Sequence, residues 1–238
     1  HHLRRRAEAG TPAPPAAPGS AGLPDASGSG LRPGIVHRLD RGTSGVLLAA
    51  KTEAALRALA AAFCERRVWK CYVAVVAGDA AEVATLREPI GRHPADRLRM
   101  AVRAEGDGGR HAHSVVHRVA SDGRLSLVAV LIRTGRTHQI RVHLQHARCP
   151  VLGDGVYGDA NWNAREARTA TRPLLHAWQL RYRHPRSGAV ECVTAPPPPD
   201  VALYGVRLAG LESAHDFTPW LAEQLERKLA YSLDGFVF

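Results

Sequence analysis

Residues 34–51 read GIVHRLDRGTSGVLLAAK and place one carboxylate in a glycine-rich turn between two apolar segments. Apolar residues lead into the turn at 35–36 and out of it at 46–50, which predicts that the chain leaves the core, bends, and returns as a strand. Gly42 and Gly45 allow backbone angles closed to other residues, and Thr43 and Ser44 supply hydroxyls that can bond to nearby amides. The pattern predicts a rigid loop that presents Asp40.

Asp40 is surrounded by the basic side chains of His37, Arg38 and Arg41. Nearby positive charge favours the ionised form of a carboxyl group, and an ionised carboxylate suits a nucleophile better than an acid. The same residues also fit an ordinary turn whose arginines are solvated. Local composition alone favours that plainer interpretation.

A series of motifs favours the active site instead. The pattern His-Arg-Leu-Asp-x-x-Thr-Ser-Gly-Val-Leu-Leu-x-Ala-Lys in residues 37–51 resembles the signature of the RluA-type pseudouridine synthases. Further segments resemble the family's motifs in the family's order: 70–78 (KCYVAVVAG), 134–144 (TGRTHQIRVHL), 151–158 (VLGDGVYG), 174–178 (LLHAW) and 184–185 (HP). Several long motifs in one order are hard to obtain by chance.

This resemblance implies an α+β fold, the pseudouridine synthase fold, with a mixed, mostly antiparallel central sheet flanked by helices and loops. It implies an RNA pseudouridine synthase, an isomerase that flips a uridine out of the RNA and converts it to pseudouridine without a cofactor or a metal. Asp40 would be the nucleophile, attacking either the sugar C1′ or the base C6. Tyr72 would stack on the uracil and is a candidate for proton transfer, and Arg141 would pair with Asp40.

The resemblance also indicates RNA-binding residues. Arg38, by its position in the motif, would fill the space that the flipped nucleotide leaves. The other candidates for contacts with RNA or with the loop are His37, Arg41, Arg136 and His138. The basic loops within residues 79–113 are assigned only collectively to phosphate contacts.

The charge of the chain agrees with a polyanionic partner. Lys and Arg total 32 against 22 Asp and Glu, a formal net charge of +10. Nucleic acid is the expected partner, because no obvious basic amphipathic helix or apolar run of about 20 residues suggests a membrane. We expect a monomer that acts on ribosomal or transfer RNA, in the cytoplasm or in an organelle such as a mitochondrion or chloroplast.

Cysteine and histidine give no sign of a metal site. The four cysteines are widely separated and form no Cys-x-x-Cys pair, so we expect reduced thiols. Histidines gather within residues 111–117 and 138–146, but neither group has a recognised ligand spacing. Solvated or RNA-facing histidines are the favoured interpretation.

The chain divides into three predicted parts. Residues 1–33 are rich in Ala, Pro and Gly and predict a flexible insertion or linker. They contain no Lys-Pro-x-Gly motif like the one that ends an upstream strand in the family, so we expect that strand to be missing. Residues 34–195 would form the catalytic domain. Residues 196–238 would form a proline-rich break and a tail with an amphipathic helix near 219–231, which either packs back or binds a partner.

Periodicity predicts the elements of the central part. A helix is expected over 52–64 with Thr52 as its N-cap, and a central strand over 68–77 with Tyr72, Ala74 and Val76 on one face. Strands at 114–120 and 125–132 should form a hairpin, and a helix should start near His138. Two further strands are expected near 174–182 and 191–194.

Two rival functions belong to other classes. A noncatalytic RNA-binding protein with the same fold would explain the motifs, but the presence of Asp40, Tyr72 and Arg141 together argues against it. A general basic protein that binds membranes or DNA would explain the charge and not the motifs.

Overall fold

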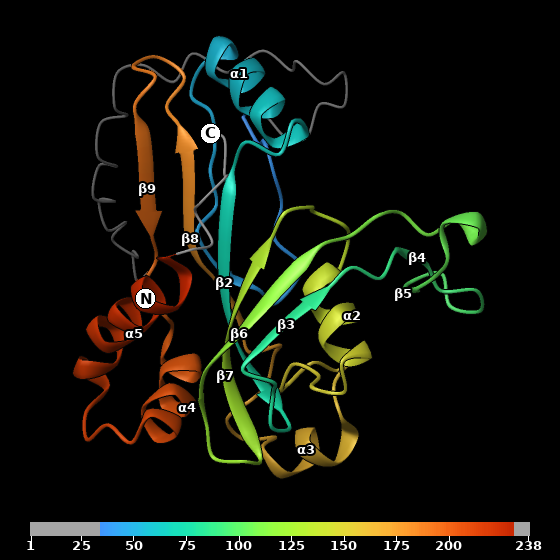
Figure 1. The fold of residues 1–238 in the computed structure, drawn as a ribbon, viewed down its shortest axis with the longest axis vertical. Coiled ribbons are helices and arrows are strands. Elements are labelled where there is room, and N and C mark those ends of the chain that lie inside the picture. The colour runs from blue at the N-terminus through green and yellow to red at the C-terminus, as the bar shows by residue number, and fades with distance from the viewer. Residues whose placement is uncertain (1–33, 231–238) are drawn as a thin grey trace, which may run out of the picture.

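A seven-stranded sheet organises the computed structural model, which describes residues 34–230 (Figure 1). The strands follow the order β1-β8-β2-β7-β6-β3, and β9 pairs with the second half of β8. All pairs are antiparallel except the β1–β8 pair, so the predicted mixed and mostly antiparallel sheet is confirmed. The strands are β1 (Ser44–Gly45), β2 (Trp69–Ala77), β3 (Val83–Leu86), β6 (Ser114–Ser121), β7 (Leu125–Ile132), β8 (Leu175–Arg183) and β9 (Val190–Thr194).

Strand β2 lies at the centre and is apolar on both sides, as its alternating pattern predicted. Tyr72, Ala74 and Val76 face a cluster that includes α2 (Gln139–His146). The alternate residues Cys71 and Val73 face the larger core on the other side of the sheet. A strand that is buried on both faces between two partners has a fixed register, and this register sets the position of Tyr72.

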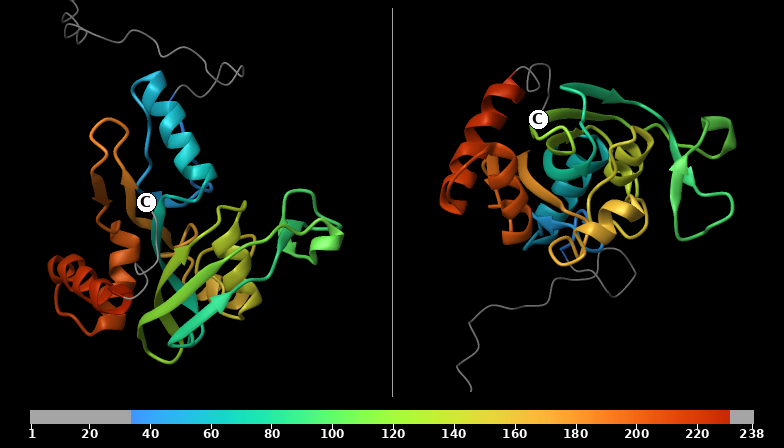
Figure 2. Two further views of the ribbon diagram at one scale, coloured as in Figure 1. Left: turned by 45° about the horizontal axis from the view of Figure 1, so that its top comes forward. Right: turned by 90° about the horizontal axis from the view of Figure 1, so that it is seen from below.

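Two C-terminal helices, α4 (Pro199–Ala209) and α5 (Ala214–Leu229), cover the larger core face, while α2 lies on the opposite side (Figure 2). Phe217 and Leu221 of α5 are fully buried. The tail therefore packs against the sheet. The predicted helix over 219–231 begins earlier, at Ala214, and α4 was not predicted.

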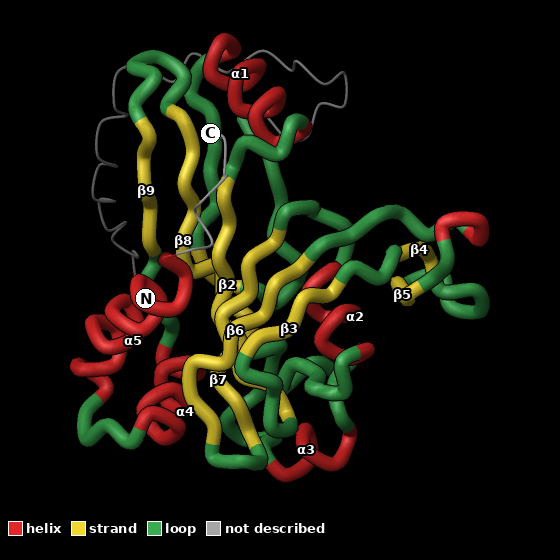
Figure 3. The backbone as a smooth tube through the Cα atoms, viewed as in Figure 1, coloured by secondary structure: helices red, strands yellow, loops and turns green. Residues whose placement is uncertain are grey.

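Several local predictions are confirmed. Helix α1 (Glu53–Cys64) begins after Thr52, whose hydroxyl accepts a hydrogen bond from the Ala55 amide. Strands β6 and β7 form the expected hairpin. Residues 79–113, predicted only as loops, include β3 and a small sheet of β4 (Ile90–Arg92) and β5 (Met100–Val102), which projects from the body of the protein (Figure 3). A 3₁₀ turn (Glu105–Asp107) and the short helix α3 (Ala160–Arg165) complete the elements.

Some predictions concern residues that the structure does not describe. Residues 1–33, with the predicted linker and the absent upstream strand, lie outside the described residues. None of the helices within residues 34–230 combines the length and the apolar character that spanning a bilayer requires.

The strand predicted over 46–51 is wrong. In its place the chain pairs with β8 in parallel only at Ser44 and Gly45, and it makes one further isolated bridge between Ile35 and Ala49. The apolar side chains after the turn instead pack in a small cluster with α1. Pairing with a distant strand decided this geometry, and local periodicity does not report such pairing.

Gly45 is required where the loop meets β8. Its φ is 114°, and a Cβ there would overlap the backbone of Ala177. We expect Gly45→Ala to lower the free energy of unfolding by more than about 1 kcal/mol, because both the backbone angle and the space exclude a side chain. Chemical denaturation measures the effect. Gly106→Ala is the matched control, since a Cβ at Gly106 meets nothing within 4 Å; equal stability of the two variants would contradict this account.

Candidate active site

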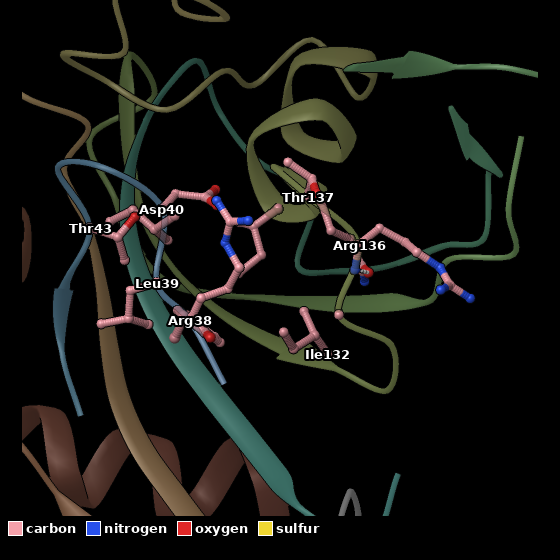
Figure 4. Close-up of a pocket in the computed structure, with 12 residues that line it drawn as sticks. Arg38, Leu39, Asp40, Thr43, Ile132, Arg136 and Thr137 are labelled. Carbon is pink, nitrogen blue, oxygen red and sulfur yellow. Dashed lines mark hydrogen bonds between the residues drawn. The ribbon is translucent and has the colours of Figure 1, made fainter. Parts of the chain in front are cut away.

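Asp40, Tyr72 and the loop after β7 line one pocket of about 100 Å³ (Figure 4). The loop over 37–43 supplies Arg38, Asp40 and Thr43, and β2 supplies Tyr72. The segment between β7 and α2 contributes Gly135, Arg136 and Thr137, and the ends of β7, α2 and β8 contribute Ile132, Gln139, Ile140 and Leu175. Segments far apart in the sequence therefore converge beside one carboxylate.

Arg141 lies next to Asp40, as the motif predicted. Its Nη1 is 3.8 Å from Oδ2 of Asp40, and its side chain is almost fully buried. His138, which precedes α2, has a φ of 56°, an unusual left-handed angle for a residue with a side chain. The helix that starts there carries Arg141 on its first turn and directs it towards the loop.

The closest partner of Arg141 is Asp154, which the sequence analysis missed. Nε and Nη2 of Arg141 donate to the two carboxylate oxygens of Asp154 at 2.6 and 2.8 Å. Such a bidentate pair fixes the plane of the guanidinium and leaves Nη1 for Asp40. Asp154 is the only acidic residue of the segment VLGDGVYG, and this was a sequence signal for its role. The Gly-Asp-Gly pattern around it indicated only a plain turn.

Asp154 is fully buried and its lone pairs are satisfied. The amides of Val156 and Tyr157 both donate to Oδ1, at 2.9 and 3.0 Å. Burial by itself raises the pKa of Asp154, but the hydrogen bonds from Arg141 and these amides outweigh it and hold the pKa below its usual value. Asp154 therefore stays charged, and it raises the pKa of Arg141 against the opposing effect of burial.

Tyr72 presents a hydroxyl that stays protonated. Burial, and then the negative charge of Asp40, raise the pKa of Tyr72 well above its usual value. Tyr72 is buried, with 9% of the residue exposed, and it lines the pocket. The side chain therefore offers a flat apolar surface and a neutral O–H group beside the carboxylate.

Only some of the predicted RNA-binding residues line the pocket. Arg38 and Arg136 line the pocket, and Figure 4 shows Arg38 extending towards Asp40 while the guanidinium of Arg136 points away from it. Nε of Arg136 donates to the His111 carbonyl at 2.9 Å. Arg41 is exposed and lies outside the residues that line the pocket.

The two histidines among the predicted RNA-binding residues make contacts with other residues of the protein. Nδ1 of His138 is 2.8 Å from the hydroxyl of Tyr157, and burial lowers the pKa of His138. Nε2 of His37 accepts a hydrogen bond from the Leu48 amide at 2.8 Å, and its ring stacks on Phe63 at 4.6 Å between centroids. His37 therefore closes the loop that carries Asp40. Within residues 34–230 no three potential ligands gather as a metal ion would require.

The contacts of His37 predict an acid-sensitive loop. Burial, then the charge of Lys70, lower the pKa of His37 from 6.5 to about 4. Between these values the unfolded chain binds a proton that the folded protein does not, so stability falls as the pH falls through this window. His37→Gln keeps an acceptor for Leu48 and does not titrate, so its melting temperature should fall less steeply than that of the wild type over this pH range. Parallel profiles of the two proteins would contradict the assignment.

Proteins of known sequence and structure resemble this chain over most of its length. Residues 18–146 match the family model described as RNA pseudouridylate synthase. An uncharacterized RNA pseudouridine synthase of Chloroflexus aurantiacus is 45% identical over 196 residues, which are 82% of this chain and 60% of that protein. The ribosomal large subunit pseudouridine synthase D of Escherichia coli K12 is 39% identical over 199 residues, 80% of this chain and 60% of the relative.

A solved structure shares the fold. Human RNA pseudouridylate synthase domain containing 1 superposes with a TM-score of 0.61 at 31% identity, covering 70% of this chain and 71% of the human chain. The chain spans 60% or less of the length of the curated relatives described above. The match of the family model over more than half of the sequence, together with this likeness, shows that the chain belongs to the RNA pseudouridylate synthase family.

Proposed function

We propose that this protein isomerises uridine to pseudouridine in RNA, with Asp40 as the nucleophile. The observation that supports the proposal best is that Asp40 and Tyr72, from separate segments, line one pocket, while Arg141 from a third segment forms an ion pair with Asp40. Membership of the family supplies the reaction, and the pocket supplies residues suited to it.

The target uridine must leave its stack to reach Asp40. Flipping costs a few kcal/mol, which contacts with the RNA backbone and stacking in the pocket must offset. Tyr72 would stack on the flipped uracil, and Arg38 would fill the vacated space in the RNA. The pocket wall around Tyr72 is largely apolar, because Leu39, Ile132 and Ile140 also line it, and such a wall favours a base over water.

The chemistry exchanges one bond to C1′ for another. The carboxylate of Asp40 attacks C1′ of the ribose or C6 of the base, and the bond between N1 and C1′ breaks. The uracil then rotates, C5 bonds to C1′, Asp40 is released, and the proton on C5 is lost while N1 gains one. The ion pair with Arg141 orients the carboxylate of Asp40 for attack. The protonated hydroxyl of Tyr72 is the nearest candidate for moving a proton at the base.

The RNA substrate is a separate part of the proposal. The formal net charge of +10 and the cationic residues around the pocket favour a polyanion. The names of relatives such as the Escherichia coli protein refer to the large ribosomal subunit, which makes ribosomal RNA the first substrate to test. We propose a monomer as the active form, since all the residues named above belong to one chain.

The activity is tested by incubating purified protein with RNA that carries tritium at uridine C5. The proposal predicts release of tritium into water, because each isomerisation removes the C5 proton. RNA binding by a folded protein that releases no tritium from ribosomal or transfer RNA would support a noncatalytic RNA-binding protein instead.

A further inference from the structure

A second pocket, with a volume of about 500 Å³, adjoins the active-site pocket. The two pockets share Arg38, Tyr72, Ile132, Gly135 and Arg136 in their walls. We call the second one the cationic pocket, because six of its lining side chains are Arg38, Arg66, Lys70, Arg110, Arg133 and Arg136. Among the described residues that line it, none is Asp or Glu.

Four of these cations lie close enough to repel one another. Arg66 lowers the pKa of Lys70, and Arg110 and Arg66 lower the pKa of Arg136, in each case after burial as the larger cause. Within residues 34–230 no ion pair involves Arg66, Lys70, Arg110 or Arg136. By contrast, Arg118, Arg172 and Arg207 elsewhere on the protein each pair with a carboxylate.

The backbone holds these side chains in place. Arg66 follows α1 with a φ of 61°, an angle that costs free energy for a residue with a side chain. Nζ of Lys70 lies 4.0 Å from the position that a Cβ of Gly135 would occupy, and 5.9 Å from the centroid of the Phe63 ring. A half-buried ammonium group thus lies beside Gly135, which lines both pockets.

Gathered cations without a carboxylate are stabilised by an anion from outside the protein. We infer that the cationic pocket binds a phosphodiester group of the RNA strand, next to the uridine that the active-site pocket holds. This inference rests on the proposed function for the position of the uridine. The shared wall of the two pockets supports it, because neighbouring nucleotides of one strand occupy adjoining sites.

Lys70 gives the pocket a pH-dependent contact. Burial, then Arg66, lower the pKa of Lys70 to about 8 in the free protein. The other titratable or charged groups that line the pocket with it are His37, Arg38, Cys64, Arg66, Tyr72, Arg110, Arg133 and Arg136. A bound phosphate favours the ammonium form of Lys70, so RNA affinity should fall as the pH rises above about 8. In Lys70→Arg the part of this decrease that comes from Lys70 should be absent, because an arginine side chain does not lose its proton in this pH range.

The test measures binding of a fluorescein-labelled single-stranded oligouridylate by fluorescence anisotropy over a series of salt concentrations. Each phosphate contact contributes about 0.7 to the slope of log K against log salt for a single strand. We expect Arg66→Gln and Lys70→Gln each to reduce the slope by about 0.7, and Lys70→Arg to keep the wild-type slope at neutral pH. Arg227→Gln, at an exposed arginine of α5, is the matched control and should bind as the wild type does.

Unchanged slopes in Arg66→Gln and Lys70→Gln, with melting temperatures equal to that of the wild type, would overturn the inference. So would stabilisation of the wild type by millimolar inorganic phosphate together with unchanged RNA slopes, because the pocket would then bind a free phosphate compound. Because the assay needs no turnover, a protein that releases no tritium but shows the reduced slopes would refute the proposed chemistry and leave the RNA-backbone site standing.

Discussion

Asp40→Asn is expected to reduce turnover by about 10⁴-fold or more, a loss typical of removing a catalytic nucleophile. The amide has nearly the shape of the carboxylate, but its oxygen carries no charge with which to attack carbon. Because Asp40 is partly exposed at the pocket and its ion pair with Arg141 is 3.8 Å long, the change should leave the fold intact. RNA affinity should stay the same or rise, since a negative charge leaves a basic surface.

Single-turnover tritium release and anisotropy measured on the same preparations separate these two effects. Asp216→Asn, which removes an exposed carboxylate from α5, is the matched control and should keep full turnover. Substantial turnover by Asp40→Asn would remove Asp40 from the nucleophile's role. A parallel loss of RNA binding would instead indicate that Asp40 holds the RNA-binding loop in shape.

Arg141→Met is expected to lower the free energy of unfolding by about 3–5 kcal/mol, the usual cost of leaving a buried charge without its partner. The stranded group is Asp154, which is fully buried and loses both hydrogen bonds from the guanidinium. Turnover should be lost as well, because Asp40 loses the cation that orients it.

A second variant separates stability from chemistry. In Arg141→Met combined with Asp154→Asn, the buried charge is gone, and the Asn oxygen can still accept from the amides of Val156 and Tyr157. We expect this pair of changes to recover much of the stability of the wild type without recovering turnover. Urea denaturation and tritium release measure the two properties, and wild-type stability of Arg141→Met alone would show that the ion pair with Asp154 is not needed.

Sequence patterns within single helices and strands predicted much of the fold. The alternation along β2 placed Tyr72 on the correct face, and Thr52 marked the start of α1, because periodicity and capping depend on near neighbours in sequence. The strand predicted over 46–51 failed because its geometry depends on β8, more than a hundred residues away. Helix α4 was hidden by the prolines that precede it.

The same difference between local patterns and long-range contacts explains which features of the site were predicted. The motifs indicated Asp40 and Arg141, and the structure brings the two together. They did not indicate that Arg141 binds Asp154 more closely, because that pairing depends on how the turn after α2 folds back over the helix. The role of His37 in closing the loop was missed for a similar reason, since its partner Phe63 belongs to α1.

We propose that Asp40 is the nucleophile in the isomerisation of uridine in RNA. Tritium release from RNA labelled at uridine C5, by the wild type and Asp40→Asn side by side, tests it most directly once both proteins melt cooperatively at similar temperatures. We expect release by the wild type and none above background by Asp40→Asn. Equal release by the two proteins, or none by a folded wild type that binds the RNA, would contradict it.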